Sequence, residues 1–426
     1  MIRIPTKRLA LVSLAIAAAA HGQATTPQPR SAYATTAAPQ SSTAARNYGF
    51  KVIVKNGDEV DGLVVQGIRS VAINDSGDIA FVANTRFGPA IFLNDKVVVH
   101  AGDELSGRQV IDVASPRINN AHPTAVLYWV QHQSPAECPK CMRNGIAINH
   151  ELKLPGLSPI PGCGTGRLIN PGTAAINDAG SYVAFVTMSD GINCWVKDGK
   201  TAAAMRTNWK TGGTHIGNFV IGSLASAGIV NLTRDGDFAF RAGPAAGTLT
   251  ANYICTLHSC TAMSAEANSL TGLVLMNSRG QIAVSVDGRI DSPELYRADN
   301  YARFKFPPMH DGVQLIDRGT MTYVRRPLRF VMNDQGDLFN GTYVFNFDDA
   351  EPGARAAPSQ GRWVPIDSGY ESGGIPGLPP SARIADAGDF AINNRGQIAR
   401  IIQFADPAAG SSVQGGRAIL MATPGN

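Results

Sequence analysis

The sequence predicts an all-β protein, a seven-bladed β-propeller of four-stranded antiparallel blades whose N-terminal strand completes the last blade. Three observations support this prediction. A turn motif recurs along the chain, a second motif recurs at the same spacing, and a spare strand near the N-terminus matches a missing strand near the C-terminus. The composition agrees, because 45 glycines and only 16% charged residues are untypical of helical bundles and coiled coils.

The first 46 residues are predicted to lie outside the propeller. Residues 1–22 have the parts of a secretory signal peptide: Arg3, Lys7 and Arg8, then the apolar run Leu9–Ala20 and small residues for cleavage. This run is too short to span a bilayer, so an uncleaved membrane anchor is the less favoured alternative. Residues 23–46 are almost entirely Ala, Thr, Ser, Pro and Gln, which predicts a disordered linker. We therefore expect export to the periplasm or the cell exterior, with residues 47–426 forming the propeller.

The charge distribution argues against a nucleic-acid partner. The formal net charge is +4, but residues 1–46 hold five basic residues and no acidic residue. Residues 47–426 therefore carry a net charge of −1. A nearly neutral body lacks the basic surface of a nucleic-acid-binding protein.

The recurring turn motif is Asn-x-x-Gly followed by Ala-Phe. The segment Ile73–Phe81 recurs as Ile176–Phe185, a further copy carries Thr233 in place of Asn, and Ile118–His122 is a decayed copy without the Gly. The residues assigned to these turns are Asn74, Gly77, Asn177, Gly180, Gly236, Asn277, Gly280, Asn333, Gly336, Asn393 and Gly396. Asn side chains mimic backbone acceptors and Gly adopts positive φ, so we predict a tight turn between two strands in each copy.

A second repeat gives the same unit length. Val52–Glu59 matches Val97–Glu104, and the 45 residues from Gly57 to Gly102 equal the distance from Gly77 to His122. The turn copies then define seven units of about 53 residues each. Such units cannot bury their own faces and are typical of radially stacked sheets.

Each unit is predicted to hold four short strands. In the first unit these are residues 69–74, 78–83, 90–93 and 96–100, and in a later unit residues 172–178, 181–188, 192–197 and 200–207. The last unit offers strands only near residues 389–394, 397–404 and 416–421. Residues 50–55 resemble a strand without a unit of its own, so we expect them to complete the last blade and close the ring.

With these copies the chain resembles bacterial exported tandem-repeat proteins whose units carry an Asn-x-x-Gly…Ala-Phe signature. The likeness covers residues 50–421 and is clearest at Asn74/Gly77/Ala80/Phe81 and Asn177/Gly180/Ala184/Phe185. The chain departs from the pattern in having no evident C-terminal anchor, and several copies have lost part of the motif. The resemblance implies a propeller-like fold in the envelope or outside the cell, and it implies no chemistry or catalytic residues.

Six cysteines in an exported chain indicate disulfides. Cys255 and Cys260 bracket a predicted hairpin turn, Cys138 and Cys141 lie in a Pro-rich insertion, and Cys163 and Cys194 remain as the third pair. Other pairings, a redox role and a metal role for Cys138-Pro-Lys-Cys141 are less favoured alternatives.

No constellation of residues predicts a specific chemistry. The acidic pairs Asp58-Glu59 and Asp103-Glu104 fall in a repeated loop, which favours a turn role over acid–base catalysis, and calcium binding by the Asn-Asp turns is a minor alternative. The basic, aromatic stretch from Tyr296 to Arg329 offers candidate anion contacts, although solvated strand faces and loop ends are the favoured explanation. Its candidate residues are Arg297, Arg303, Arg325, Arg326, Asp299 and Asp317. No metal and no cofactor are predicted.

Two classes of function follow. The favoured class is a monomeric binding or scaffold module that holds a polysaccharide, in particular an anionic glycan, or an envelope protein. The alternative is a carbohydrate-active hydrolase or lyase with its site at the mouth of the central channel. The lack of converging catalytic groups favours the non-enzymatic role.

Overall fold

The fold is built from β-strands alone in the part of the chain that the structure describes. This computed structural model describes residues 48–133, 141–205, 213–225, 230–244, 253–262, 274–285, 294–297, 302–305, 330–339, 341, 343–346, 364–365, 375–379, 383–405 and 416–425. Every regular element within these ranges is a strand. The all-β prediction is therefore confirmed.

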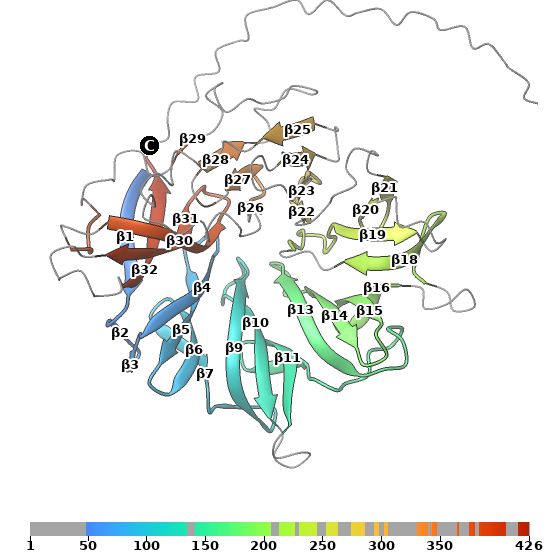
Figure 1. Ribbon diagram of the computed structural model, residues 1–426, viewed down its shortest axis with the longest axis horizontal. Helices are drawn as coiled ribbons and strands as arrows, with labels where there is room; N and C mark the ends of the chain where they lie inside the picture. The colour runs from blue at the N-terminus through green and yellow to red at the C-terminus, as the bar shows by residue number, and fades with distance from the viewer. Residues whose placement is uncertain are drawn as a thin grey trace, which may run out of the picture. The chain divides into compact units, whose positions relative to one another are not determined.

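The strands form antiparallel sheets in chain order (Figure 1). Sheets of four strands comprise β4–β7 (Gly67–Ile73, Ile79–Thr85, Gly88–Leu93, Lys96–His100), β13–β16 (Leu168–Ile176, Tyr182–Met188, Asn193–Lys197, Lys200–Ala204), β22–β25 (Val274–Met276, Ile282–Ser285, Glu294–Arg297, Ala302–Lys305) and β26–β29 (Val331–Met332, Asp337–Phe339, Tyr343–Asn346, Val364–Pro365). Consecutive antiparallel sheets that pack on one another are the architecture of a β-propeller.

Two sheets carry five strands, so the prediction of four strands in every unit is wrong for them. These sheets are β8–β12 (Glu104–Leu105, Arg108–Ile118, Val126–Gln133, Met142–Ile148, Glu151–Leu154) and β17–β21 (His215–Ile216, Phe219–Ala225, Phe240–Pro244, Tyr253–Cys255, Cys260–Ala262). The extra strand is a two-residue segment, β8 or β17, that folds back as a hairpin on the strand that follows it. The equivalent hairpin in the first unit, β2 (Glu59–Val60) with β3 (Leu63–Val64), forms a separate two-stranded sheet.

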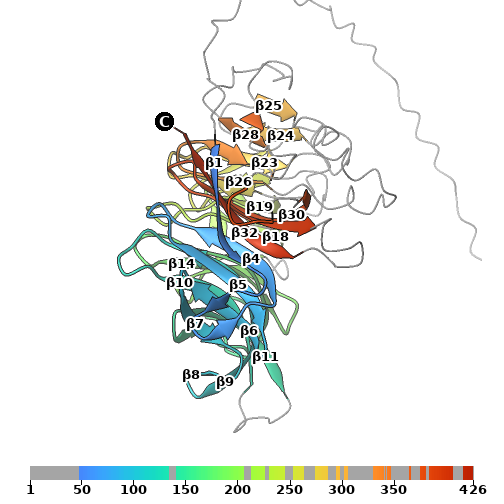
Figure 2. The ribbon, with the colours of Figure 1, turned by 90° about the vertical axis from the view of Figure 1, so that its left-hand side faces the viewer.

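The N-terminal strand closes the last sheet, as the sequence predicts. The strand order of this sheet is β1 (Tyr48–Lys55), β32 (Arg417–Pro424), β31 (Ile398–Ala405) and β30 (Arg383–Ile392). Pairing of β1 with β32 runs from Tyr48 opposite Pro424 to Lys55 opposite Ala418. The two strands lie side by side in the view of Figure 1 and in the perpendicular view of Figure 2. Both chain ends of the compact unit, residues 43–426, therefore meet in one sheet.

The Asn-x-x-Gly turns form as predicted. Their six glycines all have positive φ, between +71° and +88°. The Asn74 side-chain oxygen accepts a hydrogen bond from the Asp78 backbone N–H at 2.8 Å, and the other copies that keep Gly repeat this contact. In the copy without Asn, the hydroxyl of Thr233 accepts the same bond from Asp237 at 3.0 Å.

The turns are also joined to one another, which turn chemistry alone did not predict. The Asn side-chain N–H of one copy donates to the backbone carbonyl of the equivalent residue in the next copy. These bonds run from Asn74 to Asn119 (3.0 Å), Asn119 to Asn177 (3.1 Å), Asn177 to Thr233 (3.1 Å), Asn277 to Asn333 (3.3 Å), Asn333 to Asn393 (2.8 Å) and Asn393 back to Asn74 (2.8 Å). Thr233 has no side-chain amide to donate, and its turn is joined to the next one by a bond that other copies also make, from the backbone N–H of the following residue, Arg234, to the Ser278 hydroxyl at 3.3 Å. We call this series the turn ring.

A second set of bonds accounts for the acidic residues next to the turn ring. The Asn394 backbone N–H donates to one oxygen of Asp75 at 2.7 Å and its side-chain N–H to the other at 2.8 Å. Asp178 receives the equivalent pair from Asn120. These carboxylates thus hold neighbouring turns together.

The core lies between neighbouring sheets. Ala80 packs against the second sheet while Phe81 faces the last sheet, where Ile401 and Ile419 cover it. Further along the chain Trp195 lies between Phe185 and Phe238, with ring centroids 5.1 Å from each. The small and large residues of the motif therefore fill opposite faces of one sheet.

Two predicted disulfides are present. Cys255 pairs with Cys260 across the β20–β21 hairpin, and Cys163 bonds to Cys194 over a separation of 31 residues. Cys141 is also disulfide-bonded, and its predicted partner Cys138 lies outside the described residues.

The acidic pairs in the repeated loop serve as turn acceptors. Asp58 accepts the Lys55 backbone N–H at 2.9 Å, and Asp103 accepts the His100 backbone N–H at 2.8 Å. The same geometry in both copies supports the turn role over acid–base catalysis.

We expect Asp78 to make stability depend on pH. Burial raises the pKa of Asp78, but hydrogen bonds from Asn94, Asn74 and Thr124 outweigh it and hold this pKa below its usual range. The stabilisation is therefore present above about pH 4 and is lost as the pH falls through the folded pKa. We expect the melting temperature of Asp78→Asn to lie about 2–4 °C below that of wild type at about pH 6 and to equal it at about pH 2.5. Thermal melting across this pH range measures the difference. Asp95→Asn, in the neighbouring exposed turn, is the control, and a gap that persists at low pH would contradict this assignment.

Candidate functional site

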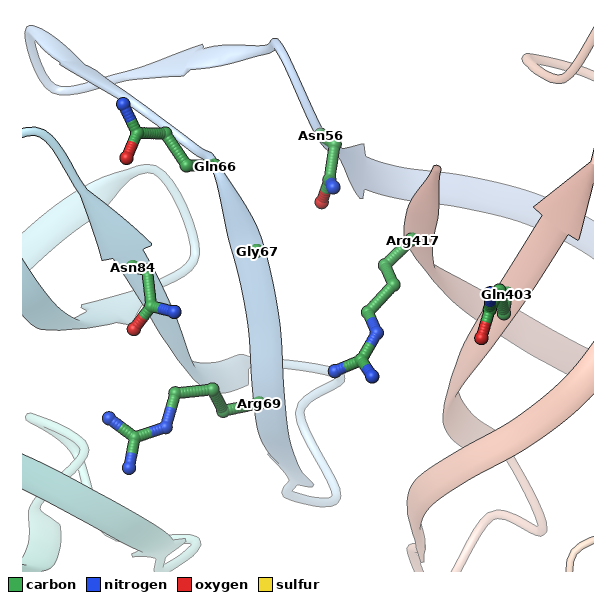
Figure 3. Close-up of a pocket in the computed structure, with 7 residues that line it drawn as sticks. All are labelled: Asn56, Gln66, Gly67, Arg69, Asn84, Gln403 and Arg417. Atoms are coloured by element: carbon green, nitrogen blue, oxygen red, sulfur yellow. The ribbon is translucent and has the colours of Figure 1, made fainter. Parts of the chain in front are cut away.

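A polar pocket of about 510 Å³ lies where the first and last sheets meet (Figure 3). It is lined by Asn56, Gln66, Gly67, Arg69, Asn84, Gln403 and Arg417. Asn56 directly follows β1, Gly67 begins β4 and Arg417 begins β32, so residues far apart in sequence come together here. The pairing of β1 with β32 builds this pocket, which we call the seam pocket.

Arg417 projects from β32 towards β4 and spans the boundary between the two sheets (Figure 3). Its guanidinium donates to the Ile68 carbonyl at 2.9 Å, and its own carbonyl accepts the Asn56 N–H at 2.9 Å. Among the described residues no carboxylate lies within ion-pair distance of Arg417. Arg417 therefore brings an unneutralised positive charge to an exposed position in the pocket.

Arg69 is the second cation of the seam pocket, and unlike Arg417 it is held by an ion pair. Its guanidinium lies 2.9 Å from a carboxylate oxygen of Asp112 on β9, and the Val113 N–H donates to the same oxygen at 2.8 Å. The ion pair is about one-third exposed, so it orients Arg69 more than it stabilises the fold.

Four amide side chains complete the lining: Asn56, Gln66, Asn84 and Gln403. An amide offers both donors and an acceptor, which suits a ligand rich in hydroxyl groups. The side-chain oxygen of Asn56 is buried and accepts no hydrogen bond within the described structure. A buried acceptor without a donor is costly, but this oxygen is shielded from solvent, so a ligand donor would reach it only after the Asn56 side chain turns towards the pocket.

The pocket lining is suited to binding rather than to acid–base chemistry. Its seven described residues include two arginines and no aspartate, glutamate, histidine or cysteine. The arrangement can hold an anion by charge and hydrogen bonds, and it offers no side chain that exchanges a proton near neutral pH.

The two described candidates of the predicted basic stretch, Arg297 and Arg303, are not among the described residues that line the seam pocket. Arg297 ends β24, where it pairs with Ala302, and Arg303 in β25 pairs with Tyr296. The other candidates, Asp299, Asp317, Arg325 and Arg326, lie outside the described residues. Sequence reasoning missed Arg69 and Arg417 because neither belongs to a repeated motif; only the predicted closure could have indicated that their strands meet.

Within the described ranges, no group of three or more His, Cys, Asp or Glu side chains is placed to hold a metal ion. No described helix could cross a membrane.

Comparisons with known proteins give only distant structural similarity. No protein-family model matches the sequence, and no curated protein matches it. Similar solved structures include a streptogramin B lyase (7% identity, 89% of this chain and 98% of that chain, TM-score 0.38) and virginiamycin B lyase from Staphylococcus aureus (10% identity, 88% and 99%, TM-score 0.37). A PQQ-bound aldose sugar dehydrogenase from Streptomyces coelicolor is similar over 89% of this chain and 98% of that chain, with 10% identity and a TM-score of 0.30. Similarity at this level assigns no activity, ligand or cofactor to this chain.

Proposed function

We propose that the protein is an exported, monomeric, seven-bladed β-propeller that binds an anionic glycan of the cell envelope or its surroundings in the seam pocket. The observation that carries this proposal is the lining of the pocket. Arg417 has no carboxylate partner among the described residues, and four amides surround it. Carboxylate-bearing sugars match this set because they combine a negative charge with many hydroxyl groups.

The turn ring supports seven blades. It links the six copies that begin at Asn74, Asn119, Asn177, Asn277, Asn333 and Asn393 with the copy at Thr233, and it returns to Asn74 from Asn393. In the four-stranded sheets other than the last, each copy lies between the first two strands in chain order, and in the last sheet Asn393 lies between β30 and β31. In the five-stranded sheets the copies lie between the second and third strands: Asn119 between β9 and β10, and Thr233 between β18 and β19. Two blades then carry a short fifth strand.

The N-terminal sequence and the disulfides both support export. Residues 1–22 have the charge and apolar pattern of a signal peptide, and residues 23–46 have the composition of a linker before the propeller. Disulfides such as Cys163–Cys194 persist in oxidising compartments. The resemblance to exported tandem-repeat proteins points to the same location.

The described pocket favours binding over the hydrolase or lyase alternative. Glycoside hydrolysis uses a pair of carboxyl groups, and none of the described residues that line the seam pocket carries one. The stretch that contains Arg297, Arg303, Arg325, Arg326, Asp299 and Asp317 is proposed as a separate anion-contacting surface, independent of the seam pocket.

We expect Arg417→Ala to weaken binding of an acidic disaccharide at least tenfold. The loss reflects the removal of a charge-assisted hydrogen bond, which contributes about 1.5–3 kcal/mol. Titration calorimetry of residues 47–426 with digalacturonate measures it, with the neutral disaccharide of galactose as the comparison ligand.

The matched control is Arg395→Ala, an exposed arginine in the turn after β30 at the other end of the same sheet. It should leave affinity unchanged, and melting curves check that both variants fold. Equal binding of digalacturonate by wild type and Arg417→Ala would contradict the proposal. Absence of any glycan binding would favour the protein-partner form of the binding module.

A further inference from the structure

We infer that Phe87 forms a second sugar subsite beside the seam pocket, so that the ligand is an acidic polysaccharide chain rather than a free sugar acid. This inference rests on the proposed function of the pocket. The structure places an exposed aromatic ring on a rigid turn directly after a strand that lines the pocket.

Phe87 is the exposed tip of the turn between β5 and β6. Its side chain is 55% exposed, which is unusual for a large apolar group in this chain. A single exposed apolar residue needs no explanation by itself, so its surroundings decide the question.

The turn holds Phe87 in one place. The buried Thr85 hydroxyl donates to the Gly88 carbonyl at 2.8 Å and accepts the Phe87 N–H at 3.2 Å. Gly88 has φ +113°, and a Cβ there would lie 2.8 Å from the Cβ of Ala101. The backbone on both sides of Phe87 is therefore fixed, which lowers the entropy cost of binding to its ring.

One face of the ring is already covered by a cation. The Arg86 guanidinium lies 4.5 Å from the ring centroid of Phe87, as in a cation–π contact. The exposed remainder of the ring can take the C–H face of a sugar, and Arg86 adds positive charge beside it. Aromatic rings that stack on ligands next to a few polar groups are typical of binding sites.

The turn lies next to the pocket along the chain and across the hairpin. Asn84 lines the pocket, and it pairs with Pro89 while Thr85 pairs with Gly88. A disaccharide bound at Arg417 and Asn84 can therefore be extended by further sugar units that reach Phe87. Arg417 and Arg86 favour an acidic chain over a neutral one, whereas the charge of Arg69 is offset by Asp112.

Binding of galacturonate oligomers of two, four and six units tests the inference. We expect wild-type affinity to rise about tenfold from the dimer to the longer oligomers, because the added units reach Phe87. Phe87→Ala should bind the dimer as wild type does and lose this gain, whereas Phe87→Trp should keep it. Arg417→Ala should weaken binding of every oligomer.

The control is Ile169→Ala, which alters a similarly exposed apolar residue at the start of β13, in another sheet. It should leave the length dependence intact. A length gain that survives in Phe87→Ala, or that Ile169→Ala also abolishes, would overturn the Phe87 subsite while leaving the pocket in place. Failure of the dimer to bind wild type would overturn the proposed function and this inference together.

Discussion

Deletion of residues 47–56 is expected to lower the free energy of unfolding by about 5 kcal/mol or more. The deletion removes β1, whose Tyr48 and Val54 are 7% and 3% exposed, and leaves the edge of β32 unpaired. Each large apolar side chain withdrawn from the core costs about 1.5–3 kcal/mol, and the lost backbone pairing adds to this. The same deletion removes Asn56 and with it one wall of the seam pocket.

Thermal and urea unfolding of the two matched truncations measure this effect. Deletion of residues 1–46 removes only the predicted signal peptide and linker and should leave the melting temperature unchanged. If deletion of residues 47–56 in that background also left the melting temperature unchanged, closure by β1 would not stabilise the fold.

Asn74→Ala is expected to destabilise the protein by about 3 kcal/mol. Asn74 is 3% exposed, and its amide bonds to both the Asp78 N–H and the Asn119 carbonyl. Alanine leaves these two groups without their partner at a buried position. Each unsatisfied group costs about 1–3 kcal/mol.

The chain itself supplies a variant that separates the two bonds. Thr233 keeps the bond within its turn and makes no side-chain bond to the next turn, so Asn74→Thr should cost about half as much as Asn74→Ala. Asn170→Ala, at an exposed position in β13, is the control and should change stability by less than about 0.5 kcal/mol. Equal stability of Asn74→Ala and Asn170→Ala in urea unfolding would show that the turn ring is energetically neutral.

The repeat made much of the fold predictable. Turn chemistry at Asn74 and Gly77 predicted the strands on either side, and the second repeat identified the decayed copy at Asn119. That copy keeps the Asn bonds to the neighbouring turns although it has lost the Gly. The missing strand of the last unit predicted the pairing of β1 with β32.

Other features could not be predicted from a repeat. The hairpins that add β8 and β17 involve only two residues each, too few for a strand pattern. The seam pocket combines side chains from β4, β5, β31 and β32 with Asn56, and each of them occurs once rather than in every unit. A site assembled where two chain ends meet leaves no periodic signal. The candidate site predicted from the sequence was therefore the locally basic stretch around Arg297 and Arg325.

The pocket lies at the boundary that β1 closes, so a ligand bound there would act on closure of the fold. Arg417 donates to Ile68 across the boundary between the last and first sheets, and Asn56 is tied to Arg417 through its backbone. A ligand that bridges Arg417 and Asn84 would add contacts across the same boundary. It would therefore stabilise the closed form by mass action.

The most direct test of the account is a crystal structure of residues 47–426 with digalacturonate. We expect seven blades joined through the turn ring, with the sugar carboxylate on Arg417 and hydroxyl groups on the amides of Asn56 and Asn84. A ring of another blade number, or a ligand bound only away from the boundary between the first and last sheets, would contradict the account.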